Sequence, residues 1–293
     1  MAFGIAGASW QSVEIPRLPP KPLLVPLTAG YRRTPVLQIG ADIYCDSQNI
    51  ALAIDQSNPP HSLFPDYTYG MAMMISNWAE TTLFDLSVRL VLTHALGKVP
   101  EDFIRDRGSL YFEPNWTEAS LRAALPSVMH ELRASLGFVE AHLAATDGTY
   151  LNGQKPCYGD AALGYICWFL RGRWDGGGTL LANYPALSTL EATLDRLGDG
   201  QPQDMDAEAA LAIATAAMPQ SPIGIIDGAS SLAIGQTVMI RPKGETADPD
   251  VVGTLRYCDG MRISIDHRHE QVGHVAVHFP VVGYVMTPID LAV

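Results

Sequence analysis

Two short segments of the sequence carry residues whose types and spacing suit the binding of an amino acid or a peptide. Thr34-Pro35-Val36 begins a short apolar run, and Asp46-Ser47 stands where a strand-like pattern changes to a helix-like one. A proline at the head of a strand has no N–H to donate, and a cis bond there would turn the preceding backbone groups toward a peptide-like ligand. A helix N-terminus suits a carboxylate, and Asp46 can meet an ammonium group. The alternative is that Ser47 only caps its helix and Pro35 only begins a strand.

Histidines form a second candidate group near the end of the chain. His267, His269, His274 and His278 lie within a stretch of twelve residues. Because alternate residues of a strand share a face, His267 and His269 would lie together, as would His274 and His278, and a hairpin could gather several of them around a metal. The alternative is a solvated turn beside a half-exposed sheet face, and we expect no bound metal.

The cysteines offer little chemistry. Cys45, Cys157, Cys167 and Cys258 are scattered, with no CxxC pair, so we expect reduced and mostly buried thiols rather than a disulfide framework. Cys45 could be considered as a nucleophile, but nothing in the sequence supplies a base or a lowered pKa, so we interpret it as a packed thiol.

Charge and composition exclude several classes of protein. Lys and Arg number 19 against 31 Asp and Glu, a net charge of −12, which disfavours nucleic acid as a partner. With 47% hydrophobic and 17% charged residues the chain is globular. No segment has the ~18 consecutive apolar residues that span a bilayer, and no basic region precedes the apolar start. We therefore expect a cytoplasmic protein with no membrane partner.

The elements that must position these residues fall into three regions, of which the first is a small α/β unit. Residues 10–15 alternate like a strand, and a Pro-rich stretch follows. Residues 35–40 and 41–45 are predicted as two strands that meet in a hairpin turn at Gly40-Ala41-Asp42. A helix is predicted from Ser47 to about Gln56.

The second region is helical and the third is rich in strands. Helices are predicted over 67–94, 117–145, 160–170 and 184–197, with Pro126 expected to kink the second or divide it. A polar linker and a short Ala-rich helix over 207–217 follow. Strands are then predicted over 237–241, 251–257, 262–266, 274–279 and 281–286, as a compact antiparallel sheet or small barrel.

The segment Thr34-Pro35-Val36-Leu37, followed by Asp46-Ser47-Gln48-Asn49-Ile50, resembles the second half of the thioredoxin-like domain of glutathione S-transferases. The resemblance implies that Pro35 is cis, that Thr34 and Val36 offer backbone contacts to glutathione, and that Asp46 and Ser47 bind its γ-glutamyl group. It also implies that Arg33 or Arg32 reaches the glycine carboxylate.

The helical region is similar to the all-helical second domain of the same family. That domain has a buried helix opened by a Ser/Thr-x-x-Asp capping box, which Asp160 followed by Ala161-Ala162-Leu163 resembles. Cys157 stands where the family has Ser or Thr, so one of the two reciprocal hydrogen bonds should be weakened. The resemblance covers about residues 9–198.

The resemblance also implies a catalytic Tyr, Ser or Cys near the end of a first strand, but no such segment is seen. Residues 10–15 would be the second strand and residues 3–8 the tail of the first helix, so we expect the first strand and part of that helix to be absent. Ser9 and Ser12 are the nearby hydroxyls, on the far side of that helix from the expected site, and the catalytic residue is unknown. Either the chain is a fragment, or something else fills the gap in the sheet.

These observations together predict an α+β multidomain protein. Residues 1–62 are interpreted as an incomplete thioredoxin-like glutathione-binding domain, 66–200 as an all-helical domain, 201–230 as a linker with a short helix, and 231–293 as a small antiparallel β module. The resemblance implies a homodimer that uses glutathione as co-substrate against an apolar electrophile, with Trp78 and Phe84 as candidate lining of the electrophile pocket; core packing is the alternative for both side chains. The rival hypothesis is a non-catalytic glutathione-fold binding protein whose β module recruits a partner.

Overall fold

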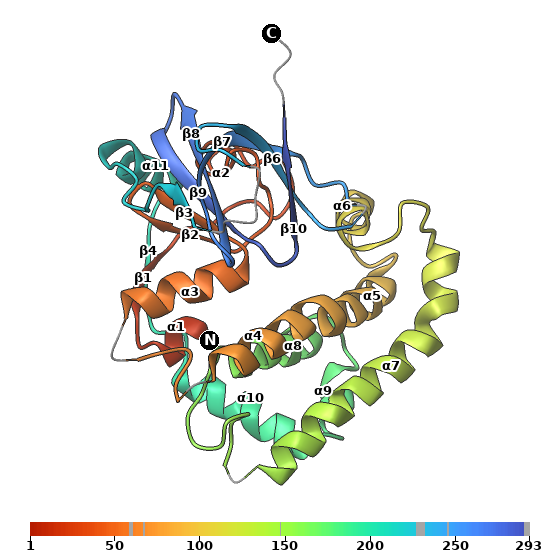
Figure 1. Ribbon diagram of the computed structural model, residues 1–293. Helices are drawn as coiled ribbons and strands as arrows, with labels where there is room; N and C mark the ends of the chain where they lie inside the picture. Colours follow the sequence, from red (N-terminus) through yellow and green to blue (C-terminus); the bar gives the residue numbers. More distant parts are fainter. Residues whose placement is uncertain (59–60, 67, 147, 227–231, 245, 290–293) are drawn as a thin grey trace. The chain divides into compact units, whose positions relative to one another are not determined.

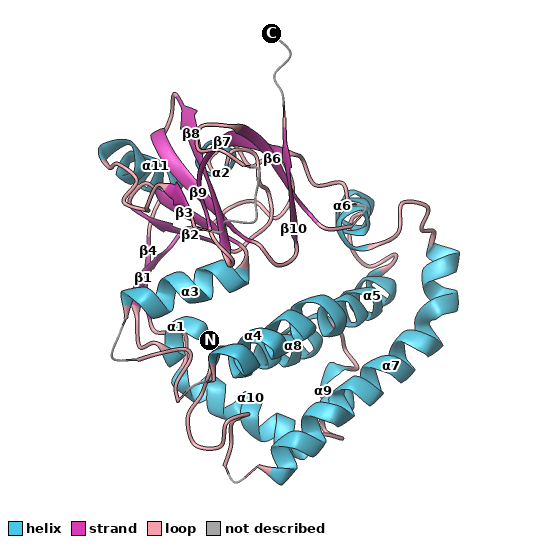
Figure 2. Cartoon of the chain, in the orientation of Figure 1, coloured by secondary structure: helices cyan, strands magenta, loops and turns pink. Residues whose placement is uncertain are grey.

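The computed structural model describes residues 1–58, 61–66, 68–146, 148–226, 232–244 and 246–289, with a mixed α/β architecture (Figures 1 and 2). The chain divides into two compact units, each built from segments far apart in sequence. The first contains Met1–Trp10 and Ile54–Pro202, and the second contains Gln11–Ala53 and Gln203–Val293.

The first unit is helical. Its helices are α1 (Ala2–Ile5), α4 (Tyr69–Trp78), the π-helix η1 (Ala79–Leu83), α5 (Phe84–Ala95), α6 (Glu101–Tyr111), α7 (Glu118–Ala145), α8 (Tyr158–Arg173), α9 (Gly177–Leu181) and α10 (Pro185–Leu197). α5 packs on α7, and α4 packs on α8. The predicted helix over 67–94 is present as the continuous run α4–η1–α5, although residue 67 lies outside the described residues. α6 and α9 were not predicted.

Local signals fix the starts of the two central helices. At α7, Thr117 and Ser120 form a capping box, in which the Thr117 side chain accepts from the Ser120 N–H and the Ser120 hydroxyl accepts from the Thr117 N–H. Pro126 lies inside this helix without dividing it. At α8, the fully buried Asp160 carboxylate accepts from the Cys157 N–H at 2.8 Å and from the Leu151 N–H at 2.8 Å. The predicted box at Cys157 and Asp160 is therefore present.

The second unit is built on one sheet. Its strands are β2 (Val36–Ile39), β3 (Asp42–Cys45), β5 (Gly224–Ile225), β6 (Thr237–Pro242), β7 (Val251–Cys258), β8 (Arg262–His269), β9 (Gly273–Pro280) and β10 (Tyr284–Pro288), and its helices are α2 (Val25–Thr28), α11 (Ala207–Ala216) and the greater part of α3 (Ser47–Ser57). The strand order is β10-β6-β7-β8-β9-β3-β2, with β5 beside β7. The five predicted C-terminal strands are all present.

The β2–β3 hairpin takes the predicted form. Ile39 pairs with Asp42 and Val36 with Cys45 in an antiparallel register, so Gly40 and Ala41 form a two-residue loop. Gly40 has a φ of 60°, a conformation that glycine adopts without a steric penalty. The other neighbour of β3 is β9, which runs parallel to it and pairs Asp42 with Ala276 and Tyr44 with His278.

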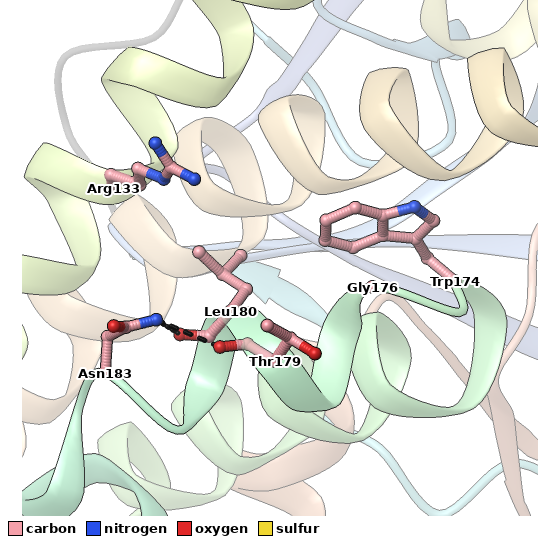
Figure 3. Close-up of a pocket in the computed structure, with 6 residues that line it drawn as sticks. All are labelled: Arg133, Trp174, Gly176, Thr179, Leu180 and Asn183. Carbon is pink, nitrogen blue, oxygen red and sulfur yellow. Dashed lines mark hydrogen bonds between the residues drawn. The ribbon is translucent and has the colours of Figure 1, made fainter.

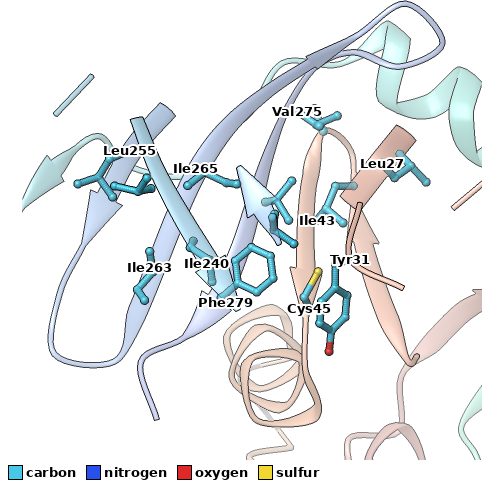
Figure 4. Close-up of a cluster of buried hydrophobic side chains, with 14 of the residues drawn as sticks. Leu27, Tyr31, Ile43, Cys45, Ile240, Leu255, Ile263, Ile265, Val275 and Phe279 are labelled. Carbon is cyan, nitrogen blue, oxygen red and sulfur yellow. The ribbon is translucent and has the colours of Figure 1, made fainter. Parts of the chain in front are cut away.

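A single hydrophobic core joins the two segments of this unit. Ile43 of β3, Ile265 of β8 and Phe279 of β9 are fully buried, and Tyr31 lies edge-on to the ring of Phe279 (Figure 4). Burying a side chain of the size of Ile or Phe contributes roughly 1.5–3 kcal/mol. The strands expected to form a separate module over 231–293 thus share both a sheet and a core with residues assigned to the 1–62 domain.

The strand expected over residues 10–15 is placed differently from the expectation. β1 (Ser9–Ser12) pairs with β4 (Gln201–Asp204) in a separate two-stranded sheet and does not join β2 and β3. Both strands are short and all of β4 is exposed, so no apolar face drives them onto the larger sheet. The interpretation of this strand as the second strand of a thioredoxin-like sheet was wrong.

None of the helices in the described part of the chain has the length and apolar character that crossing a bilayer requires.

Candidate functional site

The hairpin register brings the two predicted binding segments together. Val36 is paired with Cys45 at the open end of the β2–β3 hairpin, so Thr34-Pro35 enters β2 and Asp46-Ser47 leaves β3 at this same end. The Thr34–Pro35 peptide bond is cis, as expected, and both residues are exposed. An open backbone segment and the N-terminus of α3 therefore form one continuous candidate site.

Asp46, rather than Ser47, caps helix α3. The Asp46 Oδ1 atom accepts from the Gln48 N–H at 3.0 Å, and the Asp46 carbonyl accepts the first helical hydrogen bond, from Ile50 N. Asp46 also has a φ of 74°, in the left-handed region that few non-glycine residues adopt. Such conformations cost about 1–3 kcal/mol and gather at functional sites. The alternative in which Ser47 only caps its helix is not what the structure shows.

A pair of tyrosines supports Asp46 from behind. The Tyr284 hydroxyl donates to Asp46 Oδ2 at 3.1 Å and lies 3.0 Å from the Tyr31 hydroxyl. Both tyrosines are buried, and burial raises the pKa of each hydroxyl well above its usual value, so both remain protonated donors. Nothing in the sequence pattern pointed to either tyrosine, because their contact with Asp46 is created only by the fold.

Burial also governs the carboxyl group of Asp46 itself. It raises the pKa of Asp46 above the usual aspartate value, and hydrogen bonds from Gln48 and Tyr284 together with the nearby charge of Arg33 oppose that rise. The residue as a whole is half-buried. Ser47 is also half-buried, and the part of the chain that the structure describes offers its hydroxyl no hydrogen-bond partner. Asp46 and Ser47 thus present a carboxyl group and a hydroxyl at the helix start.

A buried amide donor lies one turn into the same helix. Asn49 is 2% exposed, and its Nδ2 atom has no acceptor among the described residues. A buried donor left without a partner costs about 1–3 kcal/mol, so such groups are normally satisfied.

Arg33 forms an ion pair with Asp248, a residue that has no distinctive signature in the sequence. Its Nε atom donates to both carboxylate oxygens of Asp248, at 2.9 and 3.0 Å, and its Nη2 atom donates to Oδ2 of the same group. The Asp248 side chain is 3% exposed. Thr246 donates to the same carboxylate at 2.7 Å. The guanidinium therefore anchors the 246–250 segment, and a contact with a ligand carboxylate would have to coexist with this ion pair.

The aromatic residues proposed for an electrophile pocket lie in the helical unit. Phe84 belongs to a cluster of aromatic rings, with centroid distances of 5.4 Å to Tyr111, 5.9 Å to Tyr165 and 5.3 Å to Phe169. It also packs against a hydrophobic core cluster that includes Val88 and Leu92 of α5. Trp78, at the end of α4, is half-buried. The contacts of Phe84 fit the core-packing alternative for this side chain.

A hollow of about 290 Å³ lies elsewhere in the helical unit. Arg133, Trp174, Gly176, Thr179, Leu180 and Asn183 line it, and Figure 3 shows Arg133 across from Trp174 with Leu180 between them. The Asn183 amide donates to the carbonyls of Thr179 and Leu180, so its donors are used within α9. None of the predicted site residues lines this hollow.

The histidines do not assemble as a metal site. His278 is fully buried and its two ring nitrogens contact Ser264 Oγ at 2.7 Å and Asp42 Oδ1 at 3.0 Å, whereas His274 contacts Asp266 at 2.7 Å. His267 and His269 stack with each other, 6.2 Å apart. Within the described ranges no group of three or more His, Cys, Asp or Glu side chains is placed to hold a metal ion. His267 and His269 lie on the same face of their strand, as predicted, but His274 and His278 bind other partners, so the four rings do not converge on one point.

The buried Ser264–His278–Asp42 arrangement is structural rather than catalytic. Ser264 and His278 are 0% exposed and Asp42 is 4% exposed, so no substrate reaches the hydroxyl. Asp42 also accepts from the backbone N–H groups of Gln220 and Ser221. Burial alone would raise the pKa of Asp42, but these donors together with His278 lower it to about 2. Burial lowers the pKa of His278, and Asp42 only partly offsets this.

The structure gives no catalytic role to the cysteine thiols or to Ser9. All four cysteines are buried and free. Burial raises the pKa of Cys45 and Cys167, and raises that of Cys157 to about 12, so none of these three is a prepared thiolate. Ser9 lies on β1, and its hydroxyl donates to Gln201. A catalytic residue is therefore not assigned.

Comparison with solved structures identifies a full-length neighbour. A GST-like protein from Pseudomonas syringae aligns with a TM-score of 0.80 and 28% sequence identity, over 98% of this chain and 93% of that chain. A mutant of poplar glutathione transferase F1 aligns with a TM-score of 0.42 and 13% identity, over 62% of this chain and 73% of that chain. Neither a protein-family model nor a curated protein sequence matches the chain. The bacterial match extends over both units, including the C-terminal strands.

Proposed function

This chain belongs to the glutathione S-transferase-like proteins, and from that premise we propose that it binds glutathione where β2, β3 and α3 meet. The observation that carries the proposal is the hairpin register, which brings Thr34-Pro35-Val36 and Asp46-Ser47 to the same end of the hairpin. In the bound state the backbone of Thr34 and Val36 pairs with the cysteinyl part of glutathione. Asp46 and Ser47 hold the ammonium and carboxylate of the γ-glutamyl end.

The reaction we propose is conjugation of glutathione to an apolar electrophile. The glutathione sulfur forms a bond to an electrophilic carbon, the leaving group departs with its electron pair, and the thiol proton passes to solvent. Glutathione is thus a co-substrate, and the task of the protein is to orient it and favour its thiolate. Trp78 remains a proposed contact for the electrophile, whereas the ring contacts of Phe84 favour core packing for that side chain. We also propose a homodimer, and the free cysteines fit the reducing conditions of the cytoplasm.

The site is tested by removing the Ser47 hydroxyl. Ser47→Ala should weaken glutathione binding about tenfold or more, because a hydrogen bond to a charged group contributes roughly 1.5–3 kcal/mol. Binding is measured by calorimetric titration, and conjugation is measured with chlorodinitrobenzene. Ser57→Ala, at the exposed far end of the same helix, is the matched control. Binding and conjugation that are unchanged in Ser47→Ala would contradict the assignment.

A second candidate function is non-catalytic glutathione binding by a protein whose C-terminal strands recruit a partner. The observation that favours it is the state of the hydroxyls and thiols around Asp46, since Tyr31 and Tyr284 are bonded to one another and Cys45 is a buried thiol. Glutathione binding that depends on Ser47, with no conjugation of any apolar electrophile tested, would favour this candidate over catalysis.

A further inference from the structure

The C-terminal strand β10 contacts the candidate glutathione site directly. Tyr284, the first residue of β10, donates its hydroxyl to Asp46 Oδ2 at 3.1 Å across a separation of 238 residues. Tyr284 is 7% exposed and packs beside Phe279 and Tyr31, so its ring is held from several sides. The orientation of its hydroxyl is therefore fixed by the core rather than by solvent.

The two tyrosine hydroxyls form a directed chain. Because the Tyr284 proton goes to the Asp46 carboxylate, the hydroxyl of Tyr31, 3.0 Å away, must donate to the Tyr284 oxygen. Hydrogen bonds arranged head to tail polarise one another in a buried setting. Thr28 donates to the Tyr31 carbonyl at 2.7 Å and fixes the backbone that carries Tyr31.

The hydrogen bonds of Asp46 leave acceptor positions on its carboxylate unused. Oδ1 accepts one hydrogen bond from Gln48 and Oδ2 accepts one from Tyr284, whereas each oxygen of an ionised carboxylate can accept about two. One acceptor position therefore remains on each oxygen. The orientation of the carboxylate is determined on one side by the helix start and on the other by Tyr284.

We propose that Tyr284 is a positioning residue, which holds the Asp46 carboxylate in the orientation that receives the γ-glutamyl ammonium group of glutathione, with Tyr31 fixing Tyr284 in turn. The inference rests on the proposed function and extends it to the C-terminal segment, which becomes part of the support of the ligand site. A carboxylate held by neighbouring donors binds its ligand with less ordering cost than a mobile one.

The test compares two ligands that differ only in the group that Asp46 would bind. Glutathione carries the γ-glutamyl ammonium, and glutaryl-cysteinylglycine lacks it but keeps the rest of the molecule. In the full chain, Tyr284→Phe should weaken glutathione binding about fivefold, because the Asp46 carboxylate loses one of its two orienting hydrogen bonds and keeps the one from Gln48. The affinity for glutaryl-cysteinylglycine should be unchanged. A variant that merely loosened the fold would weaken both ligands.

Tyr257→Phe is the matched control. Tyr257, on β7, is also 7% exposed and donates its hydroxyl to a carboxylate, that of Asp259 at 2.9 Å. The Tyr257→Phe variant should lose a similar hydrogen bond and keep the wild-type affinity for both ligands. Thermal unfolding of both variants confirms that they are folded, and Tyr31→Phe provides a second variant, with a smaller loss of glutathione affinity than Tyr284→Phe.

Asp46→Asn completes a double-mutant cycle. If Tyr284 acts through Asp46, Tyr284→Phe should have no further effect in the Asp46→Asn background. Equal affinity of wild type and Tyr284→Phe for glutathione, equal losses for both ligands, or additive effects with Asp46→Asn would each overturn the positioning role while leaving the proposed function intact. Failure of the wild-type chain to bind glutathione would overturn both.

Discussion

At the scale of single residues, Asp46 combines a left-handed backbone, a desolvated carboxyl group and hydrogen bonds from the N–H of Gln48 and the hydroxyl of Tyr284. A helix cap alone requires only the first of these hydrogen bonds. Burial raises the pKa of this carboxyl group, with Gln48, Tyr284 and Arg33 opposing the rise, and Tyr31 and Cys45 contribute no charge while they are protonated. The protonation state of Asp46 is therefore sensitive to pH above the range of an exposed aspartate.

This sensitivity gives a prediction for glutathione binding. Asp46 attracts an ammonium group only when it is ionised, and its pKa in the folded protein lies above the ordinary value, so affinity should fall on acidification at a higher pH than an exposed aspartate would give. Titrations from about pH 8 to about pH 4 measure this, with circular dichroism to confirm folding. Asp46→Asn should bind weakly with a flatter profile. A wild-type profile identical to that of Asp46→Asn would contradict the role given to the carboxylate.

How far single residues could be predicted from the sequence depends on whether their partners are local. Pro35 and the helix start at Ser47 have local signatures, and both occur as expected. The pairing of Arg33 with Asp248 and of Asp46 with Tyr284 joins residues more than 200 positions apart, and no periodicity encodes such contacts. The sequence therefore predicted the cis proline and the helix start, but not the side chains that contact Arg33 and Asp46.

At the scale of elements, the start of α8 depends on a cap of unusual composition. Asp160 provides the acidic half of the capping box, while Cys157 supplies a sulfur in place of a hydroxyl oxygen. Sulfur is a weak hydrogen-bond acceptor. Because both residues are fully buried, water cannot compensate for the weaker bond.

The cap can be tested by exchanging its acceptor. Cys157→Ser should raise the free energy of unfolding by about 0.5 kcal/mol, since a hydroxyl at an N-cap is the better acceptor, whereas Cys157→Ala should lower it by about 1 kcal/mol. Urea denaturation at neutral pH measures both changes. Cys167→Ala, in the middle of the same helix, controls for the loss of a buried thiol without a cap. Equal stability of the Ser and Ala variants at position 157 would argue against the cap.

Elements with strong periodicity or clear boundary residues were predictable. The hairpin turn at Gly40, the capping box at Thr117 and the buried helix around Asp160 all have such local signals. Helix α6, which starts directly after Pro100, was not predicted, because its N-cap position does not carry the Ser, Thr, Asp or Asn that marks a helix start in sequence. Pro126 did not divide α7, because tertiary packing of a long helix outweighs the loss of one backbone hydrogen bond.

At the scale of the whole chain, the sequence order conceals the composition of the two units. Each unit combines an N-terminal segment with a distant later one, and β3 pairs with β9 through residues 42–44 and 276–278. Regions of uniform pattern suggested contiguous domains, because hydrophobic periodicity reports the type of an element but not its partner. Which strands pair is decided by side chains that meet only in the folded state.

The contact that joins these segments leads to a prediction about acid stability. His278 of β9 links Ser264 of β8 to Asp42 of β3, and the three side chains are buried. The pKa of His278 is lowered in the folded state, so the unfolded chain binds a proton first as the pH falls below about 6.5, and stability should decline from that point. The pKa of Asp42 is lowered to about 2, so its contribution is present above about pH 4 and is lost as the pH falls toward 2.

The share of His278 in this decline can be isolated by substitution. One proton taken up on unfolding gives a slope of at most about 1.4 kcal/mol per pH unit, so His278→Asn, which does not titrate, should lose stability at neutral pH but show a shallower decline between about pH 6.5 and about pH 5. The pKa of His267 on β8 is also lowered in the folded state, but this histidine is not part of the link to β3. His267→Asn is therefore the control. Urea midpoints across this pH range measure the slopes. If His278→Asn kept the full wild-type slope while His267→Asn reduced it, the acid sensitivity would belong to the stacked pair on β8 rather than to the junction between the two segments of the sheet.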